Sequence, residues 1–142
     1  MPASRRLNVL IIEDDPIVAL DEAQLVESFG HRVIGMACEA AEAAELVRVQ
    51  KPSLVLLDVN LADGPTGPML CDWLVGTCGV PVLFVTGSPE MLPRNFAGAL
   101  GCVVKPYASH VLRAALAFAG QGGREACVES PPGLLHAPSA RP

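Results

Sequence analysis

Acidic side chains and one lysine follow three separate apolar runs of the chain. The triplet Glu13-Asp14-Asp15 follows the first run, Asp58 follows the second, and Lys105 follows the third. Short apolar runs are typical of buried strands, and the carboxyl ends of parallel strands form the ligand-binding edge of an open α/β sheet. Carboxylates gathered at one edge indicate a hard divalent cation. A lysine close to them indicates an anion, most simply a phosphoryl group.

Apolar periodicity and turn residues divide the chain into alternating strands and helices. Asp15 and Pro16 mark a helix start, because Asp is a good N-cap and Pro suits the first helical position. After the fourth strand the chain is expected to be irregular, since Pro89 and Pro93 leave room for only a short helix. The expected strands are 8–13, 31–37, 54–58, 82–85 and 102–104, and the expected helices are 16–29, 39–50, 69–78 and 108–119. This alternation predicts a parallel sheet covered by helices on both faces.

Composition narrows the class of protein. The chain has 142 residues, of which 51% are hydrophobic and 18% charged, enough for the core of one domain. Its net charge of -5 argues against a nucleic-acid-binding surface. No run approaches the roughly 18 apolar residues that a membrane span needs, and the N-terminus lacks the cleavage site of a signal peptide. We therefore expect a cytoplasmic protein that binds neither nucleic acid nor membranes.

The last 23 residues, 120–142, differ in composition from the rest of the chain. They contain four Pro and four Gly and show no apolar periodicity. Segments of this kind do not bury enough apolar surface to fold by themselves. We therefore expect one folded domain over residues 1–119, followed by a disordered tail.

Four signals occur in order at the ends of the first, third, fourth and fifth expected strands. They are Glu13-Asp14, Asp58, Thr86 and Lys105-Pro106. With these signals the chain resembles the receiver domain of bacterial two-component response regulators over roughly residues 7–119. The resemblance implies a flavodoxin-like, doubly wound, five-stranded parallel sheet with strand order 2-1-3-4-5. It also implies a signalling protein rather than an enzyme, with self-catalysed phosphoryl transfer and dephosphorylation as its only chemistry.

A Mg²⁺ site follows from the resemblance. By resemblance, Asp58 accepts the phosphoryl group, Asp14 binds Mg²⁺ directly, and Glu13 acts largely through water. The backbone carbonyl of Asn60, two residues after the acceptor, is the third protein ligand. Such a site suits Mg²⁺, which usually takes one or two protein carboxylates and keeps several waters.

Thr86 and Lys105 are implied to contact the phosphoryl group. The Thr86 hydroxyl hydrogen-bonds it in the active state, and the Lys105 ammonium pairs with one of its oxygens. The phosphoryl group would come from a sensor histidine kinase or a phosphotransfer protein. Because no output domain fits after residue 119, output is expected through a partner protein, and homodimer formation stays open.

Two positions depart from the family pattern. The switch aromatic of receivers lies three residues before the lysine, where this chain has Cys102, and Pro93 interrupts the segment of the fourth helix. We therefore expect the fourth helix to be short or irregular and switching to use no aromatic. The motif Phe84-Val85-Thr86-Gly87 resembles the Phe-Ala-Thr-Gly signature of a narrower group of stand-alone, single-domain receivers.

Two other classes of protein share some of these features. A pseudo-receiver would have the same fold and act as an interaction module without a phosphoryl group. The complete acidic pair with Asp58 and Lys105 argues against that class, and a Mg²⁺-binding measurement separates the two. A phosphatase of the haloacid dehalogenase type carries Asp-x-Asp after its first strand. That pattern is absent from both Glu13-Asp14-Asp15 and Asp58-Val59-Asn60.

Overall fold

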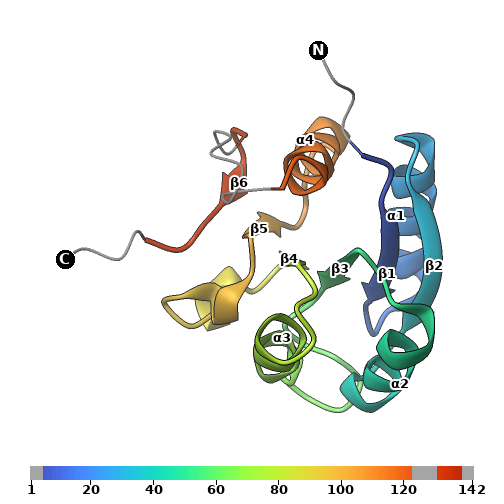
Figure 1. The fold of residues 1–142 in the computed structure, drawn as a ribbon. Helices are drawn as coiled ribbons and strands as arrows, with labels where there is room; N and C mark the ends of the chain where they lie inside the picture. Colours follow the sequence, from blue (N-terminus) through green and yellow to red (C-terminus); the bar gives the residue numbers. More distant parts are fainter. Residues whose placement is uncertain (1–4, 123–130, 139–142) are drawn as a thin grey trace.

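A single sheet of six strands forms the centre of the molecule in the computed structural model, which describes residues 5–122 and 131–138. The strand order is β2-β1-β3-β4-β5-β6, and β1 to β5 pair in parallel (Figure 1). This arrangement confirms the predicted fold class and the order 2-1-3-4-5. The strands are β1 (Asn8–Ile12), β2 (Arg32–Ala37), β3 (Leu54–Leu57), β4 (Val82–Thr86), β5 (Gly101–Val104) and β6 (Leu134–Leu135).

In the described part of the chain, four α-helices cover the sheet, with α1 and α4 on one face and α2 and α3 on the other (Figure 1). The first begins as the sequence predicts, because Pro16 occupies its first turn and the Asp15 carboxylate accepts hydrogen bonds from the next free N–H groups. None of the helices in the described part of the chain is long and apolar enough to cross a bilayer. The helices are α1 (Pro16–Ser28), α2 (Ala40–Gln50), α3 (Gly67–Gly76) and α4 (Ser109–Gly120).

Two hydrophobic cores hold these layers together, one on each face of the sheet. Alternate side chains of β1, such as Val9 and Ile11, pack with α1 and α4, while Leu10 and Ile12 pack with α2 and α3. Successive strand residues point to opposite faces, so each buried strand contributes to both cores. The strands are thereby fixed in place, and their carboxyl ends meet at one edge.

No α-helix forms between β4 and β5 among the described residues. The segment instead holds two short 3-10 turns, η1 (Pro89–Met91) and η2 (Phe96–Gly98). Phe96 and Ala97 both have φ near +53°, a conformation that costs free energy for residues other than glycine. The prediction that the segment between β4 and β5, where receivers have their fourth helix, is short or irregular is therefore confirmed, as expected from Pro89 and Pro93.

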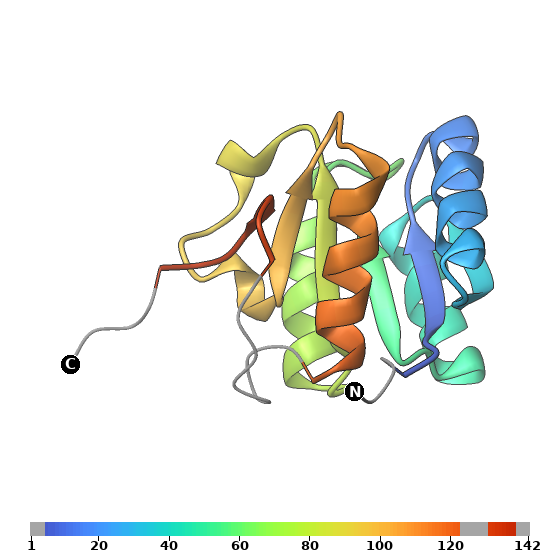
Figure 2. The ribbon, with the colours of Figure 1, turned by 90° about the horizontal axis from the view of Figure 1, so that it is seen from above.

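The C-terminal segment corrects the prediction of a disordered tail. Within residues 131–138, β6 pairs antiparallel with β5 at the outer edge of the sheet (Figure 2). The sheet thus has six strands rather than five. The prediction failed because apolar periodicity cannot be read from a strand of two residues, and because the pairing depends on an edge that only the folded sheet provides. Residues 123–130 and 139–142, which the same prediction covered, lie outside the described residues.

Candidate functional site

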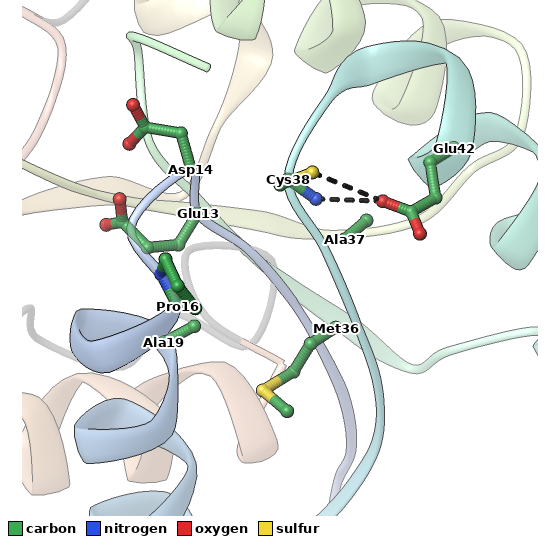
Figure 3. Close-up of a pocket in the computed structure, with 8 residues that line it drawn as sticks. All are labelled: Glu13, Asp14, Pro16, Ala19, Met36, Ala37, Cys38 and Glu42. Carbon is green, nitrogen blue, oxygen red and sulfur yellow. Dashed lines mark hydrogen bonds between the residues drawn. The ribbon is translucent and has the colours of Figure 1, made fainter. Parts of the chain in front are cut away.

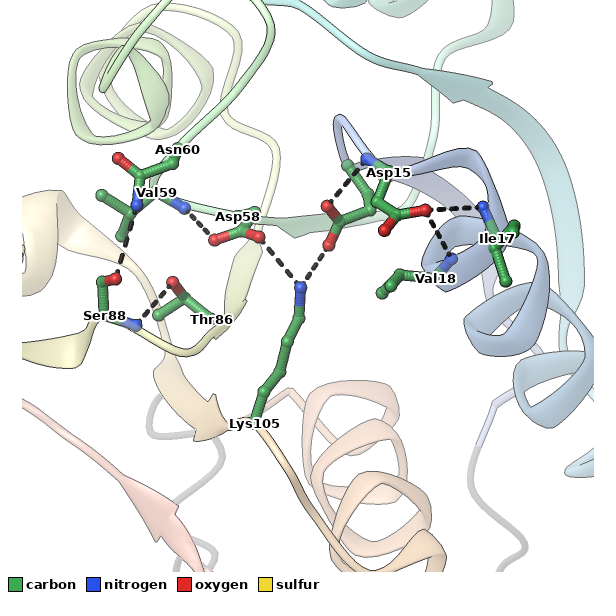
Figure 4. Close-up of polar contacts among 10 residues, drawn as sticks. Asp15, Ile17, Val18, Asp58, Val59, Asn60, Thr86, Ser88 and Lys105 are labelled. Atoms are coloured by element: carbon green, nitrogen blue, oxygen red, sulfur yellow. Dashed lines mark hydrogen bonds and ion pairs between the residues drawn. The ribbon is translucent and has the colours of Figure 1, made fainter.

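Five residues singled out in the sequence meet at the carboxyl edge of the sheet. Backbone hydrogen bonds between neighbouring strands fix the positions of these residues along the strand direction. The Asp58 N–H donates to the Ile12 carbonyl at 3.1 Å, and the Lys105 N–H donates to the Thr86 carbonyl at 2.9 Å. Figure 4 shows the Asp58 and Lys105 side chains pointing toward each other, with Thr86 beside Asp58. The five residues are Glu13, Asp14, Asp58, Thr86 and Lys105.

Three carboxylates of the site form a compact group. Glu13, Asp14 and Asp58 each offer an oxygen, and these oxygens lie within 4.8 Å of one another. Glu13 and Asp58 are buried, whereas Asp14 is exposed. Three hard oxygen donors, two of them shielded from water, fit a hard divalent cation. Asp15 takes no part, because its carboxylate caps α1.

Lys105 joins two of these carboxylates. Its ammonium lies 2.9 Å from Asp58 Oδ2 and also pairs with Glu13 Oε1. Burial acts to lower the pKa of Lys105, but the hydrogen bonds and charges of its two partners outweigh burial and raise the pKa. A fixed, fully charged ammonium beside Asp58 is suited to hold an anionic oxygen.

Asp58 and Glu13 differ in ionisation. Burial acts to raise the pKa of Asp58, but hydrogen bonds from Thr86 and Lys105, with the Lys105 charge, lower it overall. Burial, together with a hydrogen bond to Asp14, raises the pKa of Glu13 to about 7, although Lys105 opposes the shift. Asp58 is therefore the carboxylate of the pair that stays ionised at neutral pH, as a nucleophile must.

A polar rim connects β3 with the segment after β4. The Ser88 N–H donates to the buried Thr86 hydroxyl at 3.1 Å, and the Asn60 side-chain amide lies 3.4 Å from the Ser88 hydroxyl. Asn60 lies at the mouth of the site, exposed, next to the buried Val59. Ser88 was not singled out in the sequence, and its only signal is its position two residues after Thr86.

Gly67, at the start of α3, is a second residue that sequence reasoning missed. A Cβ at this position would lie 2.2 Å from the Asp58 carbonyl oxygen and 2.8 Å from Val59 Cα. The Gly67 N–H also donates to the Val59 carbonyl at 3.0 Å. The backbone of α3 thus lies directly against the acceptor loop, and glycine is required there for close approach.

Beside the carboxylates, a hollow opens between α1 and the end of β2. Figure 3 shows Glu13 and Asp14 on one side of it and Cys38 and Glu42 on the other. The Cys38 N–H donates to Glu42 Oε1 at 3.0 Å, so these two residues brace the start of α2. The hollow leaves the exposed carboxylate Asp14 accessible from solvent.

Glu22 on α1 is a buried carboxyl that the sequence did not mark. It is 3% exposed, and its Oε2 has no hydrogen-bond partner in the described part of the chain. Burial raises its pKa from 4.5 to about 8, with nearby Glu13 and Asp58 adding to the shift and Lys105 opposing it. With this raised pKa, we expect the Glu22 side chain to be mostly protonated at pH 7.

Replacing Glu22 by Gln is expected to change how stability depends on pH. Because the folded-state pKa of Glu22 is raised, folding takes up a proton between pH 4.5 and about 8, and the wild type loses stability as pH rises through that window. We therefore expect the free energy of unfolding of Glu22→Gln, measured by urea titration, to increase relative to that of the wild type as the pH rises across this range. Asp21→Asn, which changes an exposed neighbour, is the control, and a constant difference for Glu22→Gln would contradict the assignment.

The arrangement of fold and site matches one family. The model of the response regulator receiver domain matches residues 9–117. Because this match covers most of the chain, the protein belongs to the response regulator receiver domain family, and the resemblance seen in the sequence is confirmed. Members of this family take part in bacterial two-component signal transduction, and in general they bind Mg²⁺ at an acidic pocket and interact with histidine kinases or other partners.

Curated relatives are bacterial regulators rather than catalytic enzymes. The phyllosphere-induced regulator PhyR of Methylorubrum extorquens is 43% identical over 91 residues, which cover 63% of this chain and 34% of PhyR. The transcriptional regulatory protein PdtaR of Mycobacterium tuberculosis is 29% identical over 120 residues, covering 82% of this chain and 58% of PdtaR. The chain thus spans about a third of one relative and somewhat more than half of the other.

Solved structures agree with this assignment. The receiver domain of PhyR from Erythrobacter litoralis is 37% identical with a TM-score of 0.71, over 80% of this chain and 89% of that one. The anti-anti-sigma factor PhyR from Bartonella quintana is 32% identical with a TM-score of 0.72, over 87% of this chain and 52% of that one. The likeness therefore extends over most of the described fold.

Proposed function

We propose that this protein accepts a phosphoryl group on Asp58 from a histidine kinase or phosphotransfer protein, in a Mg²⁺-dependent step, and signals through a partner protein. One observation carries the proposal: Asp58 is buried, pairs with Lys105, and lies in the same carboxylate group as Glu13 and Asp14. We place this activity in the cytoplasm and in a receiver unit of residues 1–119. The test is phosphoryl uptake from acetyl phosphate by wild type and by Asp58→Asn.

The transfer itself is a displacement at phosphorus. An Asp58 carboxylate oxygen forms the new bond to phosphorus while the donor's bond breaks and its leaving group departs with the electron pair. Lys105 already contacts the attacking carboxylate, so it can hold a phosphoryl oxygen without large motion. The Thr86 hydroxyl lies beside the same carboxylate and can donate to another oxygen. In such reactions a protein contributes mainly positioning and charge stabilisation.

Mg²⁺ fits the donor set of this site. Asp14 and Asp58 would hold the ion directly, Glu13 would act through water, and the backbone carbonyl of Asn60 would complete the set. When bound, Mg²⁺ neutralises the joint charge of the carboxylates and the phosphoryl oxygens. Without such a cation, the phosphoryl group would add charge to a pocket in which the described residues place three carboxylates and one ammonium.

Asp14→Ala is expected to weaken Mg²⁺ binding more than Glu13→Ala does. Asp14 would supply a direct ligand, whereas Glu13 already pairs with Lys105 and would act through water. Removing a group that acts on a metal through its ligands or waters typically changes the affinity by about 10–100-fold. Glu13→Ala should therefore fall in that range and Asp14→Ala beyond it. Isothermal titration with MgCl₂ measures both.

The exposed Asp72 on α3 provides the matched control for this comparison. Asp72→Ala removes one negative charge outside the carboxylate group and should retain wild-type affinity for Mg²⁺. If Asp14→Ala also retained that affinity, the ligand assignment would be wrong. If the wild type bound no Mg²⁺ at all, the pseudo-receiver class would replace the phosphorylation proposal.

Output is proposed to go through a protein contact. The Bartonella quintana relative is described as an anti-anti-sigma factor, a class of protein that acts on other proteins. That structure is about twice as long as the matched region, so only the mode of output is carried over to this chain. The strand-four motif Phe84-Val85-Thr86-Gly87 is consistent with the proposed group of single-domain receivers.

A further inference from the structure

The C-terminal segment of residues 131–138 contacts the sheet through a specific fit. Leu134 pairs with Val103 and Leu135 pairs with Cys102 across the β5–β6 ladder. Leu134 is 6% exposed and joins the core beneath α1 and α4, whereas Leu135 is 44% exposed. One leucine thus anchors the segment, and the next lies along its outer side.

Two glycines shape the site for this segment. A Cβ at Gly101 of β5 would lie 2.6 Å from the Leu135 carbonyl oxygen and 2.8 Å from Leu134 Cδ1. Gly133 has φ +89°, and a Cβ there would lie 3.0 Å from Val111 Cγ1 of α4. A Cβ at Gly101 therefore has no room beside the docked strand, whereas the positive φ and the tight approach to Val111 favour glycine at position 133. The β5 edge and the α4 side thus fit a chain of the form Gly-Leu.

The strand pairing is short, which favours exchange with another extended chain. It consists of two ladder pairs, and pairings this short are marginal without further packing, which the buried side chains of Leu134 and Ala137 supply here. Residues 131–138 contain no Asp, Glu, Lys or Arg, so no charge pair reinforces the segment. The strand it covers is an edge strand, whose free N–H and C=O groups are a template for any extended chain. Figure 2 shows β6 at that outer edge, on the rim of the sheet.

We propose that the outer edge of β5, with Val111 of α4 beside it, is a strand-addition site for an extended, uncharged segment of a partner protein. Residues 131–138 close this site in cis, and a partner segment with a glycine followed by a buried leucine displaces them. Strand addition of this kind takes its affinity from main-chain hydrogen bonds and its specificity from side-chain pockets. Lys105 directly follows β5, so the site and the phosphoryl pocket share one strand. The role of this partner in signal output rests on the function proposed above, whereas the existence of the strand-addition site is independent of it.

A labelled peptide of residues 131–138 tests the site on the full-length chain. In Leu134→Asp the internal segment can no longer bury its anchoring leucine. In wild type the tethered segment competes with the free peptide at high effective concentration. The free peptide should therefore bind Leu134→Asp at least ten-fold more tightly than wild type. Leu135→Lys is a second, milder variant that should shift affinity in the same direction. Adding Gly101→Ala to either variant should remove binding, since the nearest atoms to the new Cβ belong to the docked strand.

Three outcomes would overturn the proposal. Equal peptide affinity for wild type and both variants would show that the internal segment does not occupy the site. Binding that survives Gly101→Ala would place the peptide elsewhere. A strand-exchanged dimer of the wild type in analytical ultracentrifugation would assign the site to a second copy of this chain rather than to a different partner. Phosphoryl uptake by the same samples is measured separately. Peptide binding without phosphoryl uptake would support the strand-addition site and contradict only the proposed function.

Discussion

Asp58→Asn is expected to take up no phosphoryl group from acetyl phosphate. Asn has nearly the same shape as Asp but lacks the ionised oxygen that attacks phosphorus, so the fold should persist while the acceptor is lost. Lys105 would keep its pairing with Glu13 in the variant, which limits the cost to stability. Phosphate-affinity electrophoresis after incubation with acetyl phosphate and Mg²⁺ measures the phosphorylated fraction.

Asp72→Asn is the control for this loss, because it neutralises an exposed carboxylate on α3 and should phosphorylate like wild type. Circular dichroism of all three proteins shows whether the fold is kept. A phosphorylated fraction in Asp58→Asn equal to that of wild type would place the acceptor on another residue and end the assignment.

Gly67→Ala is expected to damage both stability and phosphorylation. The new Cβ would meet the Asp58 carbonyl oxygen and Val59 Cα, both backbone atoms that cannot rotate away. Overpacking of this kind costs about 1–3 kcal/mol of unfolding free energy. The acceptor loop must shift to relieve the contact, and a displacement of about 1 Å at a reacting group can slow the reaction roughly 100-fold. Urea unfolding and the rate of phosphoryl uptake measure the two effects.

Gly76→Ala is the matched change in the same helix. A Cβ at Gly76 meets no atom within 4 Å, so stability and phosphorylation rate should stay close to wild type. If Gly67→Ala matched Gly76→Ala in unfolding free energy and in the rate of phosphoryl uptake, the close approach of α3 to the acceptor loop would not matter for stability or phosphorylation.

The sheet and the grouping of charged residues could be predicted because both depend on local patterns. The strands are short apolar runs, and parallel pairing brings their carboxyl ends to one edge whatever the details of packing. Asp58 and Lys105 were therefore expected near each other although 47 positions separate them in the chain. The irregular segment between β4 and β5 followed from Pro89 and Pro93 in the same way.

Other features depend on contacts that only the assembled fold provides. Leu134 and Leu135 form a strand because β5 offers a free edge beside them. The Pro- and Gly-rich sequence around them has no apolar periodicity from which this strand could be predicted. Nothing in the sequence distinguishes Gly67 from the other glycines of the chain, and its closeness to Asp58 depends on how α3 packs. Glu22 occupies a helix position where a glutamate is ordinary, and its burial depends on the tertiary packing around α1.

The most direct test of the central claim identifies the modified residue in the wild-type protein. Borohydride reduction converts an aspartyl phosphate to homoserine, which tandem mass spectrometry of the peptides then locates. After incubation with acetyl phosphate and Mg²⁺, we expect homoserine in place of Asp58 alone, and none when EDTA removes the metal. Homoserine at another aspartate, or an unmodified Asp58 in a protein that binds Mg²⁺ and remains folded, would contradict the account.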